Sequence, residues 1–286
     1  MTLYFSEPGT RREIGWKPTG WAFIDFFLIG IMNARLLSTI TRRDVTTRYK
    51  GAALGALWMI GSPLAMVAAY SFVIAGVFGM RVGAGDSVKE TIIGLWACLA
   101  AWQLFAETSN RSSSLMIDNA ALVKRTSFPL ALLPIAAVIT AGLGVLVSYS
   151  LVAMIYICLM GVPPLTWLLM PIPFVSLAIF ALGVSYLLVS IGTFVRDVRH
   201  AVPLCVQVGM LVSPILYPAD RIPSALAWLS AINPLTPIFE TIRALMLGNI
   251  SAPWEKLAAV TIVGIVISVA SFTLFRKRTP EFADVV

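Results

Sequence analysis

A run of seventy residues in the middle of the chain, Thr126 to Val195, has no Asp, Glu, Lys, Arg or His and reads TSFPLALLPIAAVITAGLGVLVSYSLVAMIYICLMGVPPLTWLLMPIPFVSLAIFALGVSYLLVSIGTFV. A helix needs about 20 apolar residues to cross the roughly 30 Å hydrocarbon core of a bilayer, so this run is long enough for more than one crossing. Near its middle stands Gly161-Val162-Pro163-Pro164, and consecutive prolines cannot continue a helix. The run therefore predicts two membrane-spanning helices, at 130–160 and 165–194.

Apolar segments on either side of this run predict further crossings, at about 54–78, 91–106, 201–218 and 257–275. The composition agrees, because 58% of the residues are hydrophobic and only 12% are charged, whereas soluble domains usually carry about 25% charge. The sequence thus predicts an all-α integral membrane protein with six transmembrane helices. Residues 54–275 would form the membrane domain.

The segment 222–240 is a special case among the apolar stretches. Ile222 to Phe239 is uncharged and long enough to cross, but Pro223, Pro234 and Pro237 interrupt it. Non-helical backbone at membrane depth is tolerated only where protein buries it or water lines it. We therefore expect two short re-entrant helices between spans five and six, which dip into the membrane from one side and return.

The basic residues predict the orientation of the chain. With six spans and both termini in the cytoplasm, most Lys and Arg lie on the cytoplasmic side: eight before Leu54, then Arg111, Lys124, Arg125, Arg196, Arg199, Arg276, Lys277 and Arg278. The outer side holds only Arg81, Lys89, Arg221, Arg243 and Lys256. This asymmetry follows the positive-inside rule. The net charge of +7 is therefore explained by topology and does not indicate a nucleic-acid partner.

Three predicted cytoplasmic regions differ in character. Residues 1–53 contain a ten-residue stretch, 23–32, that is apolar apart from Asp25. A basic, partly amphipathic segment follows it, and this order is typical of a helix lying in the membrane interface. The loop 107–127 is longer than a simple connector needs, so it is either a solvated loop or a short helix that docks on a soluble partner. Its polar candidates for coupling are Asn110, Arg111, Ser114, Asp118 and Asn119. Residues 276–286 form a short tail.

Several absences exclude whole classes of function. The chain has no Gly-x-x-x-x-Gly-Lys motif, so it lacks a phosphate-binding loop and cannot hydrolyse ATP by that route. The predicted spans contain no carboxylate or histidine for ion coupling, and His200 is the one histidine of the chain. Cys98, Cys158 and Cys205 lie in apolar stretches without metal-ligand spacing. We therefore expect no enzyme activity, no metal and no cofactor bound by this chain, so energy for transport must come from a partner.

Aromatic residues are spread through the predicted spans, among them Trp58 and Tyr70. Such residues form interfacial belts, or they line a conduit with a flat apolar face and a polar tip, which suits sugar rings. Both interpretations fit the sequence.

The sequence resembles a known family in several places. Residues 41–50 read TRRDVTTRYK and are followed by LGALW at 54–58 and SPL at 62–64, similar to the opening signature of type-2 ABC exporter permeases. Within that family the resemblance is to the group that exports O-antigen, capsule and teichoic-acid polymers. SPILYP at 213–218, IP at 222–223 and NPL at 233–235 resemble its fifth span and outer gate, and KRTSFP at 124–129 resembles the start of its third span.

This resemblance implies a function. Such permeases form homodimers in the bacterial inner membrane and pair with two copies of a separate ATPase, which binds ATP and Mg. The cargo would be an undecaprenyl-diphosphate-linked polysaccharide, most simply the O-antigen used in lipopolysaccharide biosynthesis. The loop 107–127 would hold the coupling helix, and 222–240 the periplasmic gate. Channel or gate residues would be Trp58, Tyr70, Pro214, Tyr217, Pro218, Asn233 and Pro234.

The basic cluster before the first span has two interpretations. Arg42, Arg43, Arg48 and Lys50 would receive the diphosphate where the substrate enters, or they would only anchor the chain to anionic lipid.

Two other functions remain open at this stage. A type-2 permease for a small drug or lipid would share the same fold. A membrane enzyme of polyprenyl-linked glycan synthesis would need a cluster of acids for a metal, whereas the predicted inner loops hold only Glu107, Asp118 and Asp197.

Overall fold

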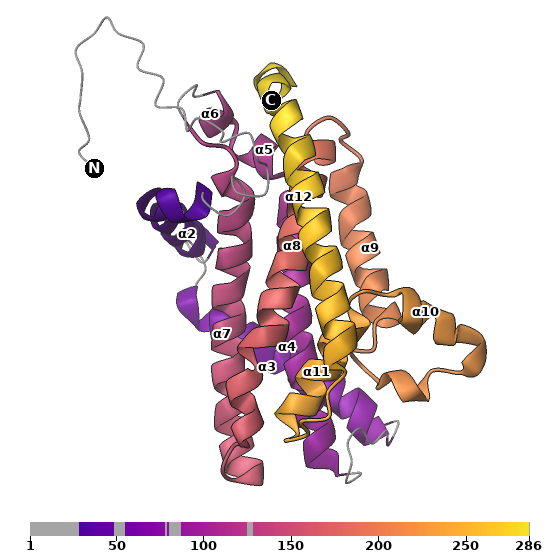
Figure 1. The fold of residues 1–286 in the computed structure, drawn as a ribbon. Coiled ribbons are helices and arrows are strands. Elements are labelled where there is room, and N and C mark those ends of the chain that lie inside the picture. The colour runs from indigo at the N-terminus through magenta and orange to yellow at the C-terminus, as the bar shows by residue number, and fades with distance from the viewer. Residues whose placement is uncertain (1–28, 49–54, 78, 80–86, 125–127, 286) are drawn as a thin grey trace, which may run out of the picture.

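The structure, a computed structural model, describes residues 29–48, 55–77, 79, 87–124 and 128–285, and most of these residues are helical (Figure 1). No strand occurs within these ranges. Lys50 and the N-terminal part of the predicted interfacial segment lie outside them. The elements are α2 (Ala34–Arg48), η1 (Gly55–Leu57), α3 (Trp58–Ser71), η2 (Phe72–Val77), α4 (Val88–Ser112), α5 (Leu115–Asp118), α6 (Ala120–Val123), α7 (Leu132–Met160), η3 (Leu165–Leu169), α8 (Pro171–Gly192), α9 (Val198–Val212), η4 (Ala219–Arg221), η5 (Ser224–Leu226), α10 (Ala227–Ile232), α11 (Thr236–Met246) and α12 (Trp254–Val285).

Five helical segments are long and apolar enough to cross a membrane: Trp58–Val77, Val88–Ser112, Leu132–Met160, Leu165–Gly192 and Trp254–Val285. The remaining predicted span, the fifth in chain order at 201–218, corresponds to α9, which has only 15 residues. At 1.5 Å per residue it is about 22 Å long, short of the roughly 30 Å hydrocarbon core. The described residues therefore form an all-helical structure with five candidate spans, and the count of six stays a prediction.

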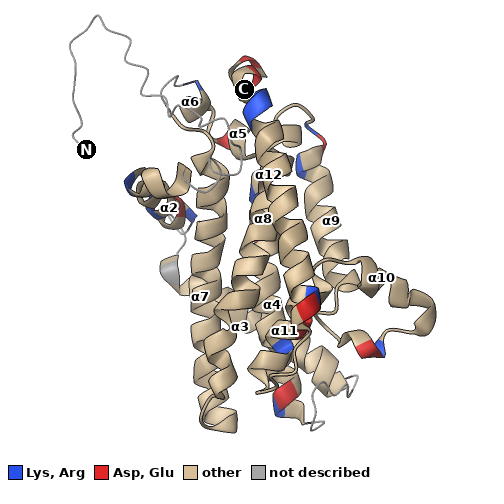
Figure 2. Cartoon of the chain, in the orientation of Figure 1, with Lys and Arg blue, Asp and Glu red and all other residues tan. Residues whose placement is uncertain are grey.

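Charged side chains gather toward the two ends of the helical bundle and leave the middle almost uncharged (Figure 2). One end carries α2, α5, α6 and the C-terminus of α12, and we call it the α6 end. The other carries α10, α11 and the start of α4, and we call it the α10 end. A bilayer requires such an uncharged band, because ionised side chains are costly in hydrocarbon.

Small residues allow the central helices to approach closely. A Cβ on Gly183 of α8 would lie 2.7 Å from Ser268 Oγ and 2.9 Å from the backbone nitrogen of the same residue in α12. Ser268 Oγ also donates a 2.7 Å hydrogen bond to the carbonyl of Ile179. A Cβ on Gly192 would lie 2.5 Å from the Ser113 carbonyl oxygen, so the end of α8 lies directly against the end of α4. Only residues without a Cβ fit at these two crossings.

The second predicted span, 91–106, is longer in the structure. Helix α4 begins three residues earlier, where Ser87 Oγ accepts a hydrogen bond from the Lys89 backbone nitrogen as a helix cap. It also continues past Glu107 to Ser112, because the charges of its last turns are paired with residues of α2. The predicted coupling loop 107–127 thus comprises the last turn and a half of α4, then α5 and α6.

The helix boundaries around the predicted gate follow the prolines. Helix α9 ends at Val212 rather than 218, because Pro214 has no backbone N–H to donate within the helix. Pro237 stands in the first turn of α11, a position that proline tolerates, so α11 continues to Met246, beyond the predicted limit of 240. Between them, η4, η5 and α10 form a short irregular arm that projects from the bundle (Figure 1).

Candidate functional site

An ionic cluster at the α6 end joins α2 to the last turns of α4 and to the junction between α5 and α6. Asp44 is the centre of this cluster: its side chain is only 7% exposed and pairs with both Arg43, at 3.2 Å, and Arg111. Arg43 Nη2 also donates a 2.9 Å hydrogen bond to Asn119 Oδ1. One buried carboxylate therefore holds α2 against the end of α4, and Arg43 extends the contact to the α5–α6 junction.

A second pair joins the same two helices. Arg48 contacts Glu107 through both of its terminal nitrogens, and one of the two hydrogen bonds, from Nη1 to Oε2, is 2.9 Å long. Such a two-bonded arginine–carboxylate pair fixes orientation as well as distance. We call the five charged residues Arg43, Asp44, Arg48, Glu107 and Arg111, together with Asn119, the ionic clamp.

The clamp brings together residues that were predicted for different roles. Arg111 and Asn119 were candidates for coupling, whereas Arg43 and Arg48 were candidates for receiving a diphosphate. The remaining described candidates lie outside the clamp. Asn110 and Arg42 are exposed. Ser114 Oγ, just before α5, donates a 2.7 Å hydrogen bond to Asp118 Oδ2 at the end of that helix. Sequence reasoning missed the two acids of the clamp. The signal was present for Asp44, an isolated acid between Arg43 and Arg48, whereas Glu107 has only Arg111 near it in the sequence.

A cleft of about 220 Å³ runs along α4 from the ionic clamp, between α3, α7 and α9. Arg48 and Glu107 line one part of it, and Tyr70, Trp96 and Trp102 give it aromatic walls. We call it the aromatic cleft. Tyr70, a predicted channel residue, therefore lines a cavity, whereas the Trp58 side chain is 47% exposed and is not among the lining residues.

A second cleft, of about 370 Å³, lies between α4, α8 and α9. Ser213, Asn233 and Leu235 line it together with Cys205 and the ring of Trp102. Asn233 Nδ2 donates a 2.8 Å hydrogen bond to Ser213 Oγ, so the segment after α10 is tied to the end of α9. We call this cavity the α9 cleft.

The other predicted gate residues surround the end of α9. Tyr217 Oη donates a 2.7 Å hydrogen bond to the carbonyl of Leu211, which folds residues 213–217 back onto the helix. Pro214 is buried and Pro218 is half-buried at the two sides of this loop, and Pro234 is half-buried next to Asn233. The candidates Pro214, Tyr217 and Asn233 thus meet at one place.

Arg243 of α11 is a residue of this region that sequence reasoning missed. It is 7% exposed, and its Nη2 donates to three carbonyls, of Pro214 at 2.8 Å, Ile215 at 3.1 Å and Tyr217 at 3.3 Å. The signal was an arginine within an apolar segment of possible membrane depth, where an ionisable side chain is functional by default.

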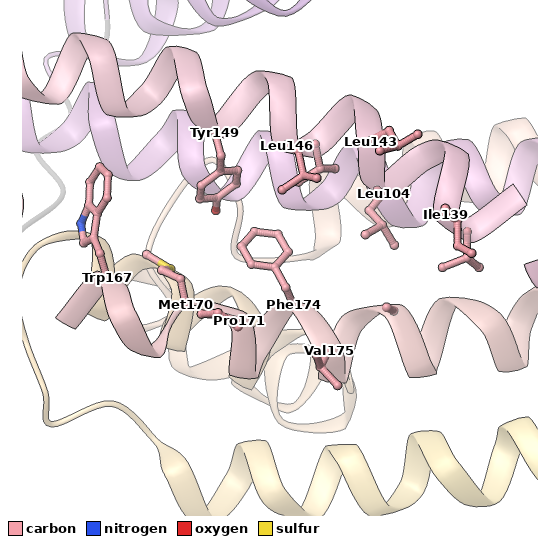
Figure 3. A pocket seen from close by; sticks show the side chains of 14 residues that line it. Leu104, Ile139, Leu143, Leu146, Tyr149, Trp167, Met170, Pro171, Phe174 and Val175 are labelled. Carbon is pink, nitrogen blue, oxygen red and sulfur yellow. The ribbon is translucent and has the colours of Figure 1, made fainter. Parts of the chain in front are cut away.

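A third cavity, of about 610 Å³, opens between α7 and α8 and is apolar (Figure 3). Leu143, Leu146 and Tyr149 line it from α7, while Trp167 and Phe174 line it from the opposite side. The Tyr149 hydroxyl is occupied by a 2.9 Å hydrogen bond to the carbonyl of Ala97. None of the predicted site residues lines this groove.

The described part of the chain contains no group of three or more His, Cys, Asp or Glu side chains that could hold a metal ion. The clamp contains acids, but each is paired with arginine. Its arrangement fits the docking of helices against one another.

Comparison with known proteins identifies the family of this chain. Residues 35–247 match the family described as ABC-2 type transporter, which covers α2 to the end of α11. The chain belongs to the ABC-2 type transporter family. The match begins at α2, so it includes the ionic clamp, the aromatic cleft, the α9 cleft and the loop 213–217 that Arg243 contacts.

Individual ABC-2 relatives extend the likeness over most of the chain. It is 30% identical over 252 residues to the O-antigen export system permease protein RfbA of Klebsiella pneumoniae, covering 88% of this chain and 95% of that protein. It is 25% identical over 251 residues to the O-antigen export system permease protein RfbA of Myxococcus xanthus, covering 87% of this chain and 94% of that one. This ABC-2 chain therefore corresponds to almost the whole length of those permeases.

Proposed function

We propose that this chain is the transmembrane subunit of an ATP-driven exporter that moves undecaprenyl-diphosphate-linked polysaccharide, specifically O-antigen, from the cytoplasm to the periplasm. The observation that carries the proposal is the similarity to O-antigen export permeases along 88% of the chain. The aromatic cleft adds support, because Tyr70, Trp96 and Trp102 offer flat apolar faces of the kind that sugar rings stack on.

A separate ATPase subunit supplies the energy in this proposal. The sequence has no phosphate-binding loop of its own. The short helices α5 and α6 project at the α6 end and provide a docking surface for that subunit. ATP and Mg bind to the partner, and movement of α5 and α6 reaches α2 and α4 through the ionic clamp.

The α6 end faces the cytoplasm in this proposal, and both termini lie on the cytoplasmic side of the bacterial inner membrane. Arg276, Lys277 and Arg278 near the end of α12 lie at the same end as α2, which carries a further four arginines. Helix α9 acts as the fifth of six spans, lengthened by the loop 213–218, and α10 and α11 are re-entrant helices at the periplasmic side.

The functional unit is a homodimer with two ATPase subunits. Only Val202 of the 15 residues of α9 is buried in the single chain, and Leu204, Val208 and Leu211 on that helix are 63%, 51% and 55% exposed. In a two-fold dimer the same patch on both chains can meet. A second copy of this chain is the partner we assign to that face.

Disulfide crosslinking tests the dimer. In a chain with Cys158→Ser and Cys205→Ser, we expect Leu204→Cys or Leu211→Cys to yield a covalent dimer under mild oxidation. Leu146→Cys on α7 is the matched control, since that side chain is 64% exposed but faces the groove beside α8. Equal crosslinking at all three positions would indicate random collision in the membrane, and absence at both α9 positions would remove α9 from the interface.

The diphosphate of the substrate contacts the basic residues of α2 in this proposal. Arg48 lies at the aromatic cleft, and Arg42, Arg43 and Lys50 belong to the same segment. Replacing all four with glutamine should abolish stimulation of the partner ATPase by lipid-linked substrate while the complex still assembles. Unchanged stimulation would exclude a role of these residues in binding the diphosphate.

The experiment that tests the function is deletion of the gene, followed by measurement of polysaccharide at the cell surface and of undecaprenyl-linked polymer inside the cell. We expect loss at the surface with accumulation inside. Normal surface polymer, in a strain without a redundant exporter, would favour a permease for a smaller drug or lipid. Loss of polymer both outside and inside would favour an enzyme of glycan synthesis.

A further inference from the structure

Arg243 is a buried cation whose Nη2 donates to backbone carbonyl groups, while the Cys98 thiol also lies against its side chain. No ion pair is recorded for it within the described ranges, although Glu240 lies one turn earlier on α11. Its Nη2 is instead surrounded by the carbonyls of Pro214, Ile215 and Tyr217, at 2.8 to 3.3 Å. A buried guanidinium is strongly disfavoured unless such partners compensate its lost hydration.

The three carbonyl groups in turn depend on Arg243 as their hydrogen-bond donor. They lie in the loop after α9, beyond the last residue of the helix, so no helical hydrogen bond satisfies them. Pro214 and Pro218 supply no N–H, so the loop itself has few donors for them. One arginine therefore provides the hydrogen-bond donor for three carbonyl groups. Without it these carbonyls would be unpaired, which would destabilise this conformation of the loop.

The stem of Arg243 lies against α4, on the side where that helix lacks a side chain. A Cβ on Gly94 would be 3.5 Å from Cγ of Arg243 and 3.9 Å from Cδ. Three turns or more along the same helix, Glu107 and Arg111 belong to the ionic clamp. Helix α4 is thus in contact with Arg243 near one end and with α2 at the other.

The loop that Arg243 holds lies beside the α9 cleft. Ser213, at the start of the loop, lines that cleft together with Asn233. Cys205, in the middle of α9, lines it as well. Ser213 is the one residue of 213–217 that lines the cleft, so displacement of this loop would remove Ser213 from the end of the cleft next to the C-terminus of α9.

We propose that Arg243 is the latch of the outer gate: its guanidinium holds the loop 213–217, and with it Ser213, at the end of the α9 cleft at rest, and opening breaks those three hydrogen bonds. Arg243 is a positioning residue and does not contact cargo. The inference rests on the proposed periplasmic orientation of the α10 end. Because its stem lies against α4, movement of that helix at the ionic clamp is transmitted to the latch.

Labelling of Cys205 from the periplasmic side tests the latch. The full chain, with Cys158→Ser and in complex with its ATPase, is placed in right-side-out vesicles with a membrane-impermeant maleimide. Cys98 is buried but lies against the Arg243 side chain, so it is also replaced by Ser, and Cys205 is the one native thiol that remains. We compare Arg243 with Lys, Gln and Met at that position, because these side chains carry five, three, two and no N–H donors.

We expect the labelling rate without nucleotide to rise in the order Arg, Lys, Gln, Met, with at least a fivefold difference between the ends of the series. Arg221→Met is the matched control, since Arg221 is an exposed arginine of η4 in the same region, and its rate should equal that of the parent chain. A merely structural role would lower the thermal unfolding temperature without this graded change in access.

Equal labelling rates across the variants that assemble would overturn the latch, and so would an increase with Arg221→Met as large as with Arg243→Met. If Arg243→Met does not assemble, the comparison of Lys and Gln decides in the same way. The assay needs no polysaccharide, so a graded result stands even where the cargo is something else. If the labelling rate rises in the expected order but the parent chain does not export polymer, only the proposed cargo is refuted.

Discussion

Helices α3 and α4 are neighbours of similar predicted role, yet their surroundings in the single chain are opposite. In the most apolar window of α4, 78% of the residues are buried, whereas in that of α3 with η2 only 17% are. Helix α4 is the less apolar of the two, although it lies at the centre. In a membrane, apolarity indicates that a helix meets lipid, while polar and small residues mark where helices meet each other.

The comparison divides the molecule into a packed group and an open pair. The packed group is α4, α7, α8, α11 and α12, which share two cores of buried side chains. The open pair is α3 and α9, which have one buried residue each within their α-helical parts. Changes inside the packed group should therefore affect folding, whereas changes on the open pair should affect assembly and transport.

The largest effect is expected at the crossing of α8 and α12. Gly183→Ala places a Cβ 2.9 Å from the backbone nitrogen of Ser268, which cannot move without moving α12. We expect a loss of about 3 kcal/mol in unfolding free energy, the upper part of the usual range for overpacking. Gly142→Ala on α7 is the control, because nothing lies within 4 Å of its added Cβ. Thermal unfolding in detergent measures both, and equal stability of the two variants would contradict the close packing.

A smaller effect is expected at the ionic clamp. Asp44→Asn leaves Arg111 and Arg43 facing a neutral amide, with a cost of roughly 1 to 2 kcal/mol, because both arginines remain partly exposed and can be hydrated. The variant should also weaken coupling between α2 and the α5–α6 segment, measured as ATP-dependent export.

Asp197→Asn is the control for the clamp. Asp197 is an exposed acid at the same end of the bundle whose side chain makes no cap hydrogen bond to α9. Its replacement should change neither stability nor export. If both aspartates proved equally dispensable, α2 would be held by its apolar contacts with α7 and the clamp would have no mechanical role.

The smallest effect is expected from single hydroxyls. Ser112 Oγ of α4 and Ser185 Oγ of α8 lie 2.6 Å apart and are buried. Ser112→Ala should cost about 0.6 kcal/mol, the average for hydrogen bonds between helices in membranes. Ser62→Ala on α3 should cost nothing measurable, since Ser62 is exposed and bonds only to the Trp58 carbonyl of its own helix. A larger loss for Ser62 than for Ser112 would reverse the comparison between the two helices.

The general architecture could be predicted because it depends on local sequence. The run 126–195 has no charge, and the break at Gly161 needs no distant partner: α7 ends at Met160, and Gly161 takes a φ of 91° that favours glycine. The all-helical class followed from the length and apolarity of such runs.

The remaining features depend on contacts between distant residues. Helix α4 continues past Glu107 because Arg48, 59 residues earlier, pairs with it. Arg243 is buried because carbonyls 26 to 29 residues earlier in the chain surround it. No local pattern encodes these partners, so the sequence indicated charged residues of interest but neither the clamp nor the latch.

The most direct test of the account is transport in inverted inner-membrane vesicles that contain this chain and its ATPase, with lipid-linked O-antigen on their outer face. We predict that ATP makes the polysaccharide inaccessible to an added glycosidase, and that omission of either subunit prevents this protection. If polymer stays accessible while ATP is hydrolysed and a smaller amphiphile enters the vesicles, the chain is a permease for another cargo and the central claim is wrong.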